Sequence, residues 1–204
     1  VAEELCNIVN GPVLGLDEQT SHCAADGRGR GPLRGQALLN GRFTETSLSD
    51  AGSNASAAHL LHIGTHFVLR PGQVSRSWLL LGDDTRLPLT RLRKLPLGSP
   101  RLVTMSACET AVSGNAGAGD GREVDGLAGA LLENGARQVL ASLWRVDDQA
   151  TAGFMRDFYA ALMGSRGDAA TALARAQRLA IAAGAPAHHW AAFVLVGRAP
   201  AWSR

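Results

Sequence analysis

The 204-residue sequence contains no apolar run near the roughly 20 residues that cross a bilayer, and its start, VAEELC, lacks the build of a signal peptide. These absences predict a soluble, cytoplasmic protein without a membrane partner. The net charge is only +2 and the arginines form no run, which excludes a typical nucleic-acid partner. An initiator methionine is also missing, so we interpret the chain, which starts at Val1, as a fragment of a longer protein.

Cysteine is scarce. Cys6, Cys23 and Cys108 are odd in number and irregular in spacing, which argues against a disulfide framework. We therefore expect a reducing compartment and at least one free thiol.

Metal-ligand patterns are also lacking. The spacing of His59, His62 and His66 suits one face of a helix, but the surrounding LLHIGT has the character of a strand, where His59 and His62 would point to opposite sides. Cys23 has no second pair of ligands nearby. We expect neither a metal nor an organic cofactor.

With 46% hydrophobic and 19% charged residues, the composition is that of an ordinary globular protein. The length fits one α/β domain spanning residues 1–204. Strand-length apolar runs alternate with helical segments, which is typical of a mostly parallel sheet flanked by helices. The predicted strands are residues 36–40, 59–65, 101–107, 138–144 and 192–197, the middle three forming the centre of the sheet. The predicted helices are residues 1–9, 44–51, 124–134, 149–164 and 168–183.

Local signals mark the ends of several helices. Asp148 and Asp168 precede or open helical segments and are suited to cap their first turns. Gly135 and Gly184 stand where glycines end helices.

Two segments are predicted to be flexible loops. Residues 11–34 are rich in Gly, Asp, Ser, Arg and Pro. Residues 113–122, SGNAGAGDGR, follow Cys108 closely and indicate either an active-site lid or a surface insertion. The glycines of this second segment do not form a phosphate loop, because no Lys-Ser or Lys-Thr follows them.

A thiol and an imidazole follow two of the predicted central strands. His66 ends LLHIGTHF and Cys108 ends the apolar run of LVTMSAC, so parallel strands would bring both residues to one edge of the sheet. An adjacent histidine can supply the base that a thiol of pKa ~8.5 needs to become a nucleophile. The alternative is that Cys108 is a small buried residue and His66 a hydrogen-bonded residue at the edge.

Six blocks in this order resemble the CHAT domain family: LLHIGTHF, LVTMSACETA, VDGLAGALLENGARQVLASLWRVDDQAT, FMRDFYAALM, ALARAQRLA and HHWAAFVLVG. The resemblance implies a three-layer, caspase-like α/β fold and a Cys–His dyad, whose matching positions here are Cys108 and His66. It also implies a protein or peptide substrate, and control by upstream helical repeats, sensor domains or a partner protein.

The resemblance also suggests roles for neighbouring residues. Many family members have glycine after the histidine, with an N–H that holds the oxyanion; this chain has Phe67, which keeps the N–H and would act together with the N–H near Cys108. SLWRVDD resembles a separase segment whose acidic residue selects arginine, so Asp148, or Asp147 as the alternative, is predicted to bind a basic substrate side chain. A simple helix cap is the competing role for Asp148.

The sequence thus predicts a cysteine endopeptidase. A non-catalytic, caspase-like interaction module within a regulatory assembly is the alternative from another class, and acyl transfer to an amine is a third reading.

Overall fold

The computed structural model describes residues 9–10, 13–14, 32–53, 60–68, 70, 74–106 and 122–198. These residues belong to two compact units. The sheet unit comprises the described residues of 44–145 and 192–198, and the helical unit comprises those up to residue 43 and from 146 to 191.

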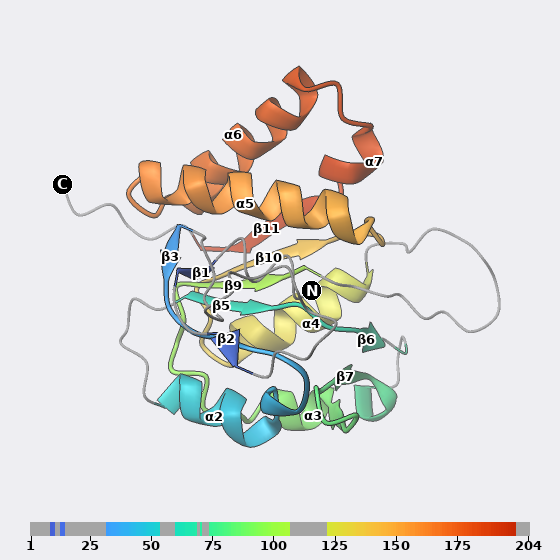
Figure 1. Cartoon of the computed structure of the whole chain (residues 1–204). Coiled ribbons are helices and arrows are strands. Elements are labelled where there is room, and N and C mark those ends of the chain that lie inside the picture. Colours follow the sequence, from blue (N-terminus) through green and yellow to red (C-terminus); the bar gives the residue numbers. More distant parts are fainter. Residues whose placement is uncertain are drawn as a thin grey trace. The chain divides into compact units, whose positions relative to one another are not determined.

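The sheet unit contains a four-stranded sheet in the order β11-β10-β9-β5 (Figure 1). Its strands are β5 (Leu60–Ile63), β9 (Leu102–Met105), β10 (Gln138–Ser142) and β11 (Phe193–Gly197). β5, β9 and β10 run parallel, and β11 pairs antiparallel with β10. All four lie within the predicted strands, so the prediction of a mostly parallel sheet is confirmed.

One prediction about this sheet is wrong. Every residue of β9 and β10 is buried, as in central strands, but β5 is the edge strand of the described sheet and only Ile63 is fully buried in it. An edge strand has a neighbour on one side only, and the apolar run of β5 does not by itself distinguish an edge from a centre.

Helix α4 (Arg122–Glu133) packs against β10 and ends as predicted. Gly135 adopts a φ of 101°, which favours glycine, and the N–H of Ala136 donates to the carbonyl of Leu131 at 3.0 Å. Helices α2 (Glu45–Ser53) and α3 (Leu89–Leu92) belong to the same unit. The α/β class, with a mostly parallel sheet flanked by helices, is confirmed and is consistent with a caspase-like three-layer fold.

A second sheet of the same unit was not predicted. It consists of β6 (Phe67–Val68), β7 (Trp78–Leu80) and β8 (Arg86–Pro88), which are antiparallel and lie in that order. The register partners Phe67, Leu79 and Leu87 are at most 2% exposed and form its buried face. A short 3₁₀ turn, η2 (Val74–Arg76), precedes β7.

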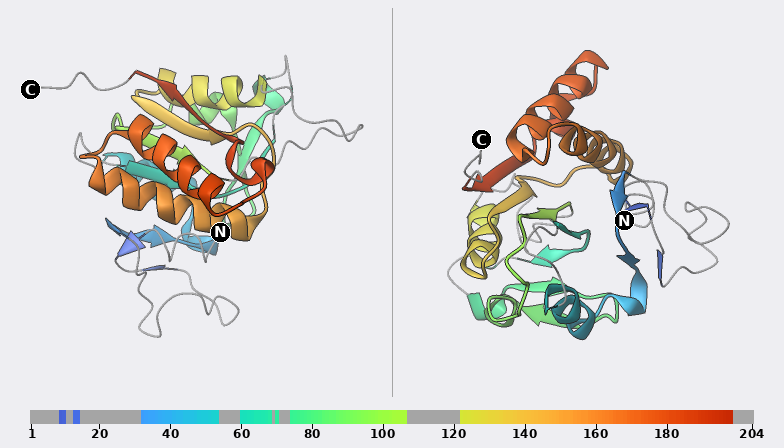
Figure 2. Two further views of the ribbon diagram at one scale, coloured as in Figure 1. Left: turned by 90° about the horizontal axis from the view of Figure 1, so that it is seen from above. Right: turned by 90° about the vertical axis from the view of Figure 1, so that its left-hand side faces the viewer.

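In the helical unit, α5 (Asp148–Gly164) and α6 (Ala169–Ala182) lie side by side (Figure 2), and α7 (Ala187–Trp190) contacts both. Gly184 has a φ of 70°, as predicted for a glycine that ends a helix. No helix of the described ranges is both long and apolar enough to cross a membrane.

The described residues of this unit also include four short strands and a 3₁₀ turn. β1 (Val9–Asn10) pairs with β3 (Leu33–Arg34), β2 (Val13–Leu14) pairs with β4 (Ala37–Leu38), and η1 (Asn40–Arg42) follows. Val9 is therefore in a strand and not at the end of the predicted helix 1–9, whose other residues lie outside the described ones. β2 and β3 fall within the predicted loop 11–34, of which residues 11–12 and 15–31 are outside the described residues.

Asp168 caps α6 as predicted: its carboxylate accepts from the backbone N–H groups of Ala170 and Thr171. The hydroxyl of Thr171 donates to the same carboxylate at 2.6 Å, and this bond is the main cause that lowers the pKa of Asp168 below 3.8.

The lowered pKa predicts a pH dependence. A carboxyl group whose pKa is lower in the folded than in the unfolded state stabilises the fold at pH values above its unfolded-state pKa. This stabilisation is lost as the pH falls through the pKa that the group has in the folded state. Between about pH 5 and about pH 2.5, the Tm of Asp168→Asn should therefore fall less than that of the wild type. Equal decreases in thermal unfolding would contradict this role.

Candidate active site

The carboxyl ends of β5, β9 and β10 lie at one level. Met105 of β9 is the register partner of both Ile63 of β5 and Ala141 of β10. Beyond the paired residues, the N–H of Ser106 donates to the carbonyl of Ile63 at 3.2 Å, so the chain leaving β9 stays bound to β5.

A side-chain contact joins the same two strands. Nε2 of His62 lies 3.0 Å from Oγ of Ser106, whose residue is 6% exposed. This contact ties the segment that leads to His66 to the segment that leads to Cys108. Neither His62 nor Ser106 was predicted as a site residue, and the only signal in the sequence is that each shortly precedes a member of the predicted dyad.

The backbone on either side of His66 is held by β7. The N–H of Leu80 donates to the carbonyl of His66 at 2.9 Å, and the hydroxyl of Thr65 donates to the carbonyl of Leu80 at 2.8 Å. His66 itself is exposed. The arrangement fixes the main chain of His66 at an exposed position.

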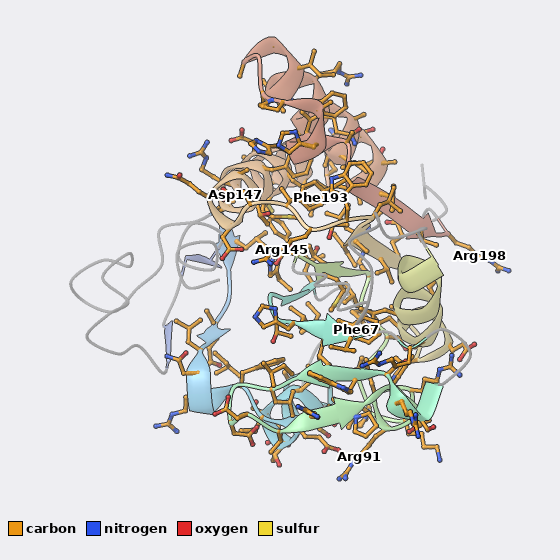
Figure 3. All side chains as sticks on the ribbon, turned by 90° about the vertical axis from the view of Figure 1, so that its right-hand side faces the viewer. Phe67, Arg91, Arg145, Asp147, Phe193 and Arg198 are labelled. Atoms are coloured by element: carbon orange, nitrogen blue, oxygen red, sulfur yellow. The ribbon has the colours of Figure 1, made fainter. Side chains whose placement is uncertain are left out.

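Phe67 follows directly, buried to 2% exposure in β6 (Figure 3). His66 and Leu80 are opposite each other and hydrogen-bonded, so the next pair, Phe67 and Leu79, is a non-hydrogen-bonded pair of the antiparallel ladder. The N–H of Phe67 therefore points away from β7, toward the open edge of the sheet.

This geometry bears on the substitution of phenylalanine for glycine. Phe67 has the extended backbone of a strand and not a positive φ, so the larger side chain causes no backbone strain. Its ring fills the core while its N–H faces outward. An N–H in this position can hold an oxyanion, as the glycine N–H would.

Cys108 lies outside the described residues, as do Cys6, Cys23 and residues 113–121 of the predicted loop 113–122, whose last residue, Arg122, begins α4. The last described residue before it is Ser106. The pairing of Cys108 with His66 therefore stays a prediction.

The predicted cap of α5 is wrong by one residue. Asp147 is the N-cap, and its Oδ1 accepts from the N–H groups of Gln149 and Ala150 at 3.0 Å each. Asp148 is instead the first residue of the helix, because the chain turns one residue earlier than the pattern suggested. Within the described part of the chain, the exposed Asp148 carboxylate has no hydrogen-bond or ion-pair partner.

Among the described residues, no group of three or more His, Cys, Asp or Glu side chains is arranged to hold a metal ion. His59 lies outside those residues.

The fold and the site together define a class. A mostly parallel sheet carries an accessible histidine after one strand and a cysteine in the segment after the next, which is the arrangement of caspase-like proteins. A comparison with protein families matches the CHAT domain over residues 17–198, so the chain belongs to the CHAT domain family, as its sequence blocks predicted. A search among curated proteins found no match.

Proposed function

We propose that this CHAT domain is a cysteine endopeptidase with Cys108 as nucleophile and His66 as general base and acid. One observation supports it above all. Ile63 and Met105 are register partners, His66 follows Ile63 by three residues, and Cys108 follows Met105 by three residues. Because consecutive Cα atoms are about 3.8 Å apart, Cys108 must lie within about 7.6 Å of Ser106, measured between Cα atoms.

The proposed reaction has two stages. His66 takes the thiol proton, the Cys108 sulfur attacks the scissile carbonyl, and the N–H groups of Phe67 and Cys108 hold the oxyanion. The C–N bond then breaks as the His66 imidazolium gives its proton to the leaving amine. A water molecule, deprotonated by His66, finally hydrolyses the thioester and releases the acid.

The test is cleavage of a peptide library, with the cut sites mapped by mass spectrometry for the wild type and for Cys108→Ala. Cleavage by the wild type alone supports the proposal. A peptide carrying a thiol-reactive group provides the second measurement. Preferential labelling of Cys108 over Cys6 and Cys23 supports an activated nucleophile, whereas equal labelling favours an interaction module.

We further propose that Asp148 binds a basic residue, most readily arginine, on the acyl side of the scissile bond. Asp147 is occupied as the helix cap, so Asp148 has the carboxylate that remains for a ligand. A carboxylate accepts two parallel hydrogen bonds from a guanidinium, which lysine cannot supply.

The two aspartates should therefore separate in experiment. Asp147→Ala should lower the free energy of unfolding by about 1 kcal/mol, the typical value of a cap. Asp148→Ala should leave thermal stability nearly unchanged and should lower the preference for arginine over a neutral residue in kcat/KM. If Asp148→Ala unfolds at a lower temperature and keeps the same preference, its role is structural.

A further inference from the structure

One face of the β6–β8 sheet is continuous with His66. Successive side chains of a strand alternate between the two faces, and Phe67, Leu79 and Leu87 occupy the buried one. The register therefore assigns to the other face, which we call the outer face, the positions of His66, Val68, Trp78, Leu80, Arg86 and Pro88. Of these, only Val68 is buried.

The outer face is apolar beside His66. Trp78 and Leu80 are half-buried, so each leaves part of its apolar surface accessible. The Arg86 guanidinium carbon lies 4.6 Å from the centroid of the Trp78 ring, and this cation–π contact orients the indole. Trp78 and Leu80 form an apolar platform on this face.

The platform is close to the proposed reaction centre. Leu80 is opposite His66 in a hydrogen-bonded pair, whose Cα atoms are typically about 5.5 Å apart. Phe67, with its outward N–H, is the next residue along β6. A carbonyl held by this N–H would lie beside the imidazole, one strand away from the platform.

The role of His66 as the acid for the leaving amine determines which part of the substrate lies near the platform. His66 must approach the leaving nitrogen to protonate it, so the residue that bears this nitrogen lies on the His66 side of the scissile bond. We propose that Trp78 and Leu80 bind the side chain of the substrate residue immediately after the scissile bond and select a bulky apolar side chain there. This inference rests on the proposed peptidase function.

The expected size of the effect follows from partial burial of one apolar side chain. Leucine or phenylalanine at this position should give a kcat/KM about tenfold above that of glycine. Lysine should be no better than glycine, because the side chains of Trp78 and Leu80 offer its ammonium group no hydrogen-bond acceptor and the Arg86 guanidinium beside Trp78 repels it.

The experiment uses fluorescence-quenched peptides built on one mapped cleavage sequence, which differ only in the residue after the scissile bond. Leu80→Ala keeps the main-chain bonds to His66 and should reduce the leucine-to-glycine ratio of kcat/KM to about a third or less. Trp78→Leu should reduce the phenylalanine-to-glycine ratio similarly. Leu195→Ala removes a half-buried leucine from β11 and is the matched control, whose ratios should equal those of the wild type.

A coumarin amide of the same acyl sequence separates the two proposals, since it places no amino-acid side chain after the scissile bond. If the wild type cleaves neither the amide nor the peptides, the peptidase function is overturned and the platform with it. If it cleaves the amide but prefers glycine or a charged residue in the peptides, only the platform is overturned. The wild-type profile gives this answer even where Trp78→Leu fails to fold, and unchanged ratios in Leu80→Ala would also overturn the platform.

Discussion

Alanine in place of either Cys108 or His66 should lower kcat for peptide hydrolysis by roughly a thousandfold or more. Without His66 the thiol loses its base and the leaving amine loses its acid, and without Cys108 no acyl-enzyme can form. Since the two groups act as a unit, the double variant should be no slower than the slower single variant. The rates are measured with one peptide under single-turnover conditions.

Thermal unfolding of each variant distinguishes the loss of a reacting group from the loss of the fold. His66 is exposed, so His66→Ala should leave the unfolding temperature nearly unchanged. Cys23→Ala is the matched control for Cys108→Ala and should retain the wild-type rate. Near-normal turnover by Cys108→Ala, or rate losses of the two single variants that multiply in the double variant, would refute the dyad.

Among the substitutions proposed for this protein, truncation of the Phe67 side chain should lower stability the most. Phe67→Ala should lower the free energy of unfolding by about 3–5 kcal/mol, because it removes a 2% exposed ring from the face formed with Leu79 and Leu87. Chemical denaturation measures the loss. Phe67→Leu, which keeps most of the apolar volume, should lose considerably less.

The same variant separates packing from chemistry at this position. The N–H proposed to hold the oxyanion belongs to the backbone and is present in Phe67→Ala. At a temperature where this variant is folded, its kcat should therefore fall far less than that of His66→Ala. Equal losses of kcat in the two folded variants would assign the phenylalanine ring itself to the reaction.

Long, buried elements were predictable because many residues repeat the same signal. β9 and β10 are runs of apolar residues whose burial on both faces requires no alternation, and the caps of α6 and α4 are local to a few residues. The proposed placement of the site at the ends of parallel strands rests on the same reasoning, because that edge is common to all parallel strands of a sheet.

Short elements and side-chain contacts were not predictable in this way. β6, β7 and β8 are two or three residues long, too short to show a period, and their pairing depends on which side chains find the core. The His62–Ser106 contact joins residues 44 apart in the chain and depends on the β5–β9 register. The cap of α5 was misassigned because two adjacent aspartates both suit the position and only the local turn selects Asp147.

Two backbone hydrogen bonds hold the segments of the proposed dyad, and they close loops of different length during folding. The carbonyl of His66 accepts a hydrogen bond from the N–H of Leu80, 14 residues further along the chain. The N–H of Ser106, just after β9, donates to the carbonyl of Ile63 in β5, 43 residues earlier in the chain. Closing a shorter loop costs less conformational entropy, so the antiparallel β6–β7 turn can assemble before the parallel pairing of β5 with β9. During folding, the imidazole would then be positioned while the segment bearing the thiol is still unpaired. A partly folded chain would consequently hold the proposed base without the proposed nucleophile, and the proposed hydrolysis would begin only once β9 had paired with β5.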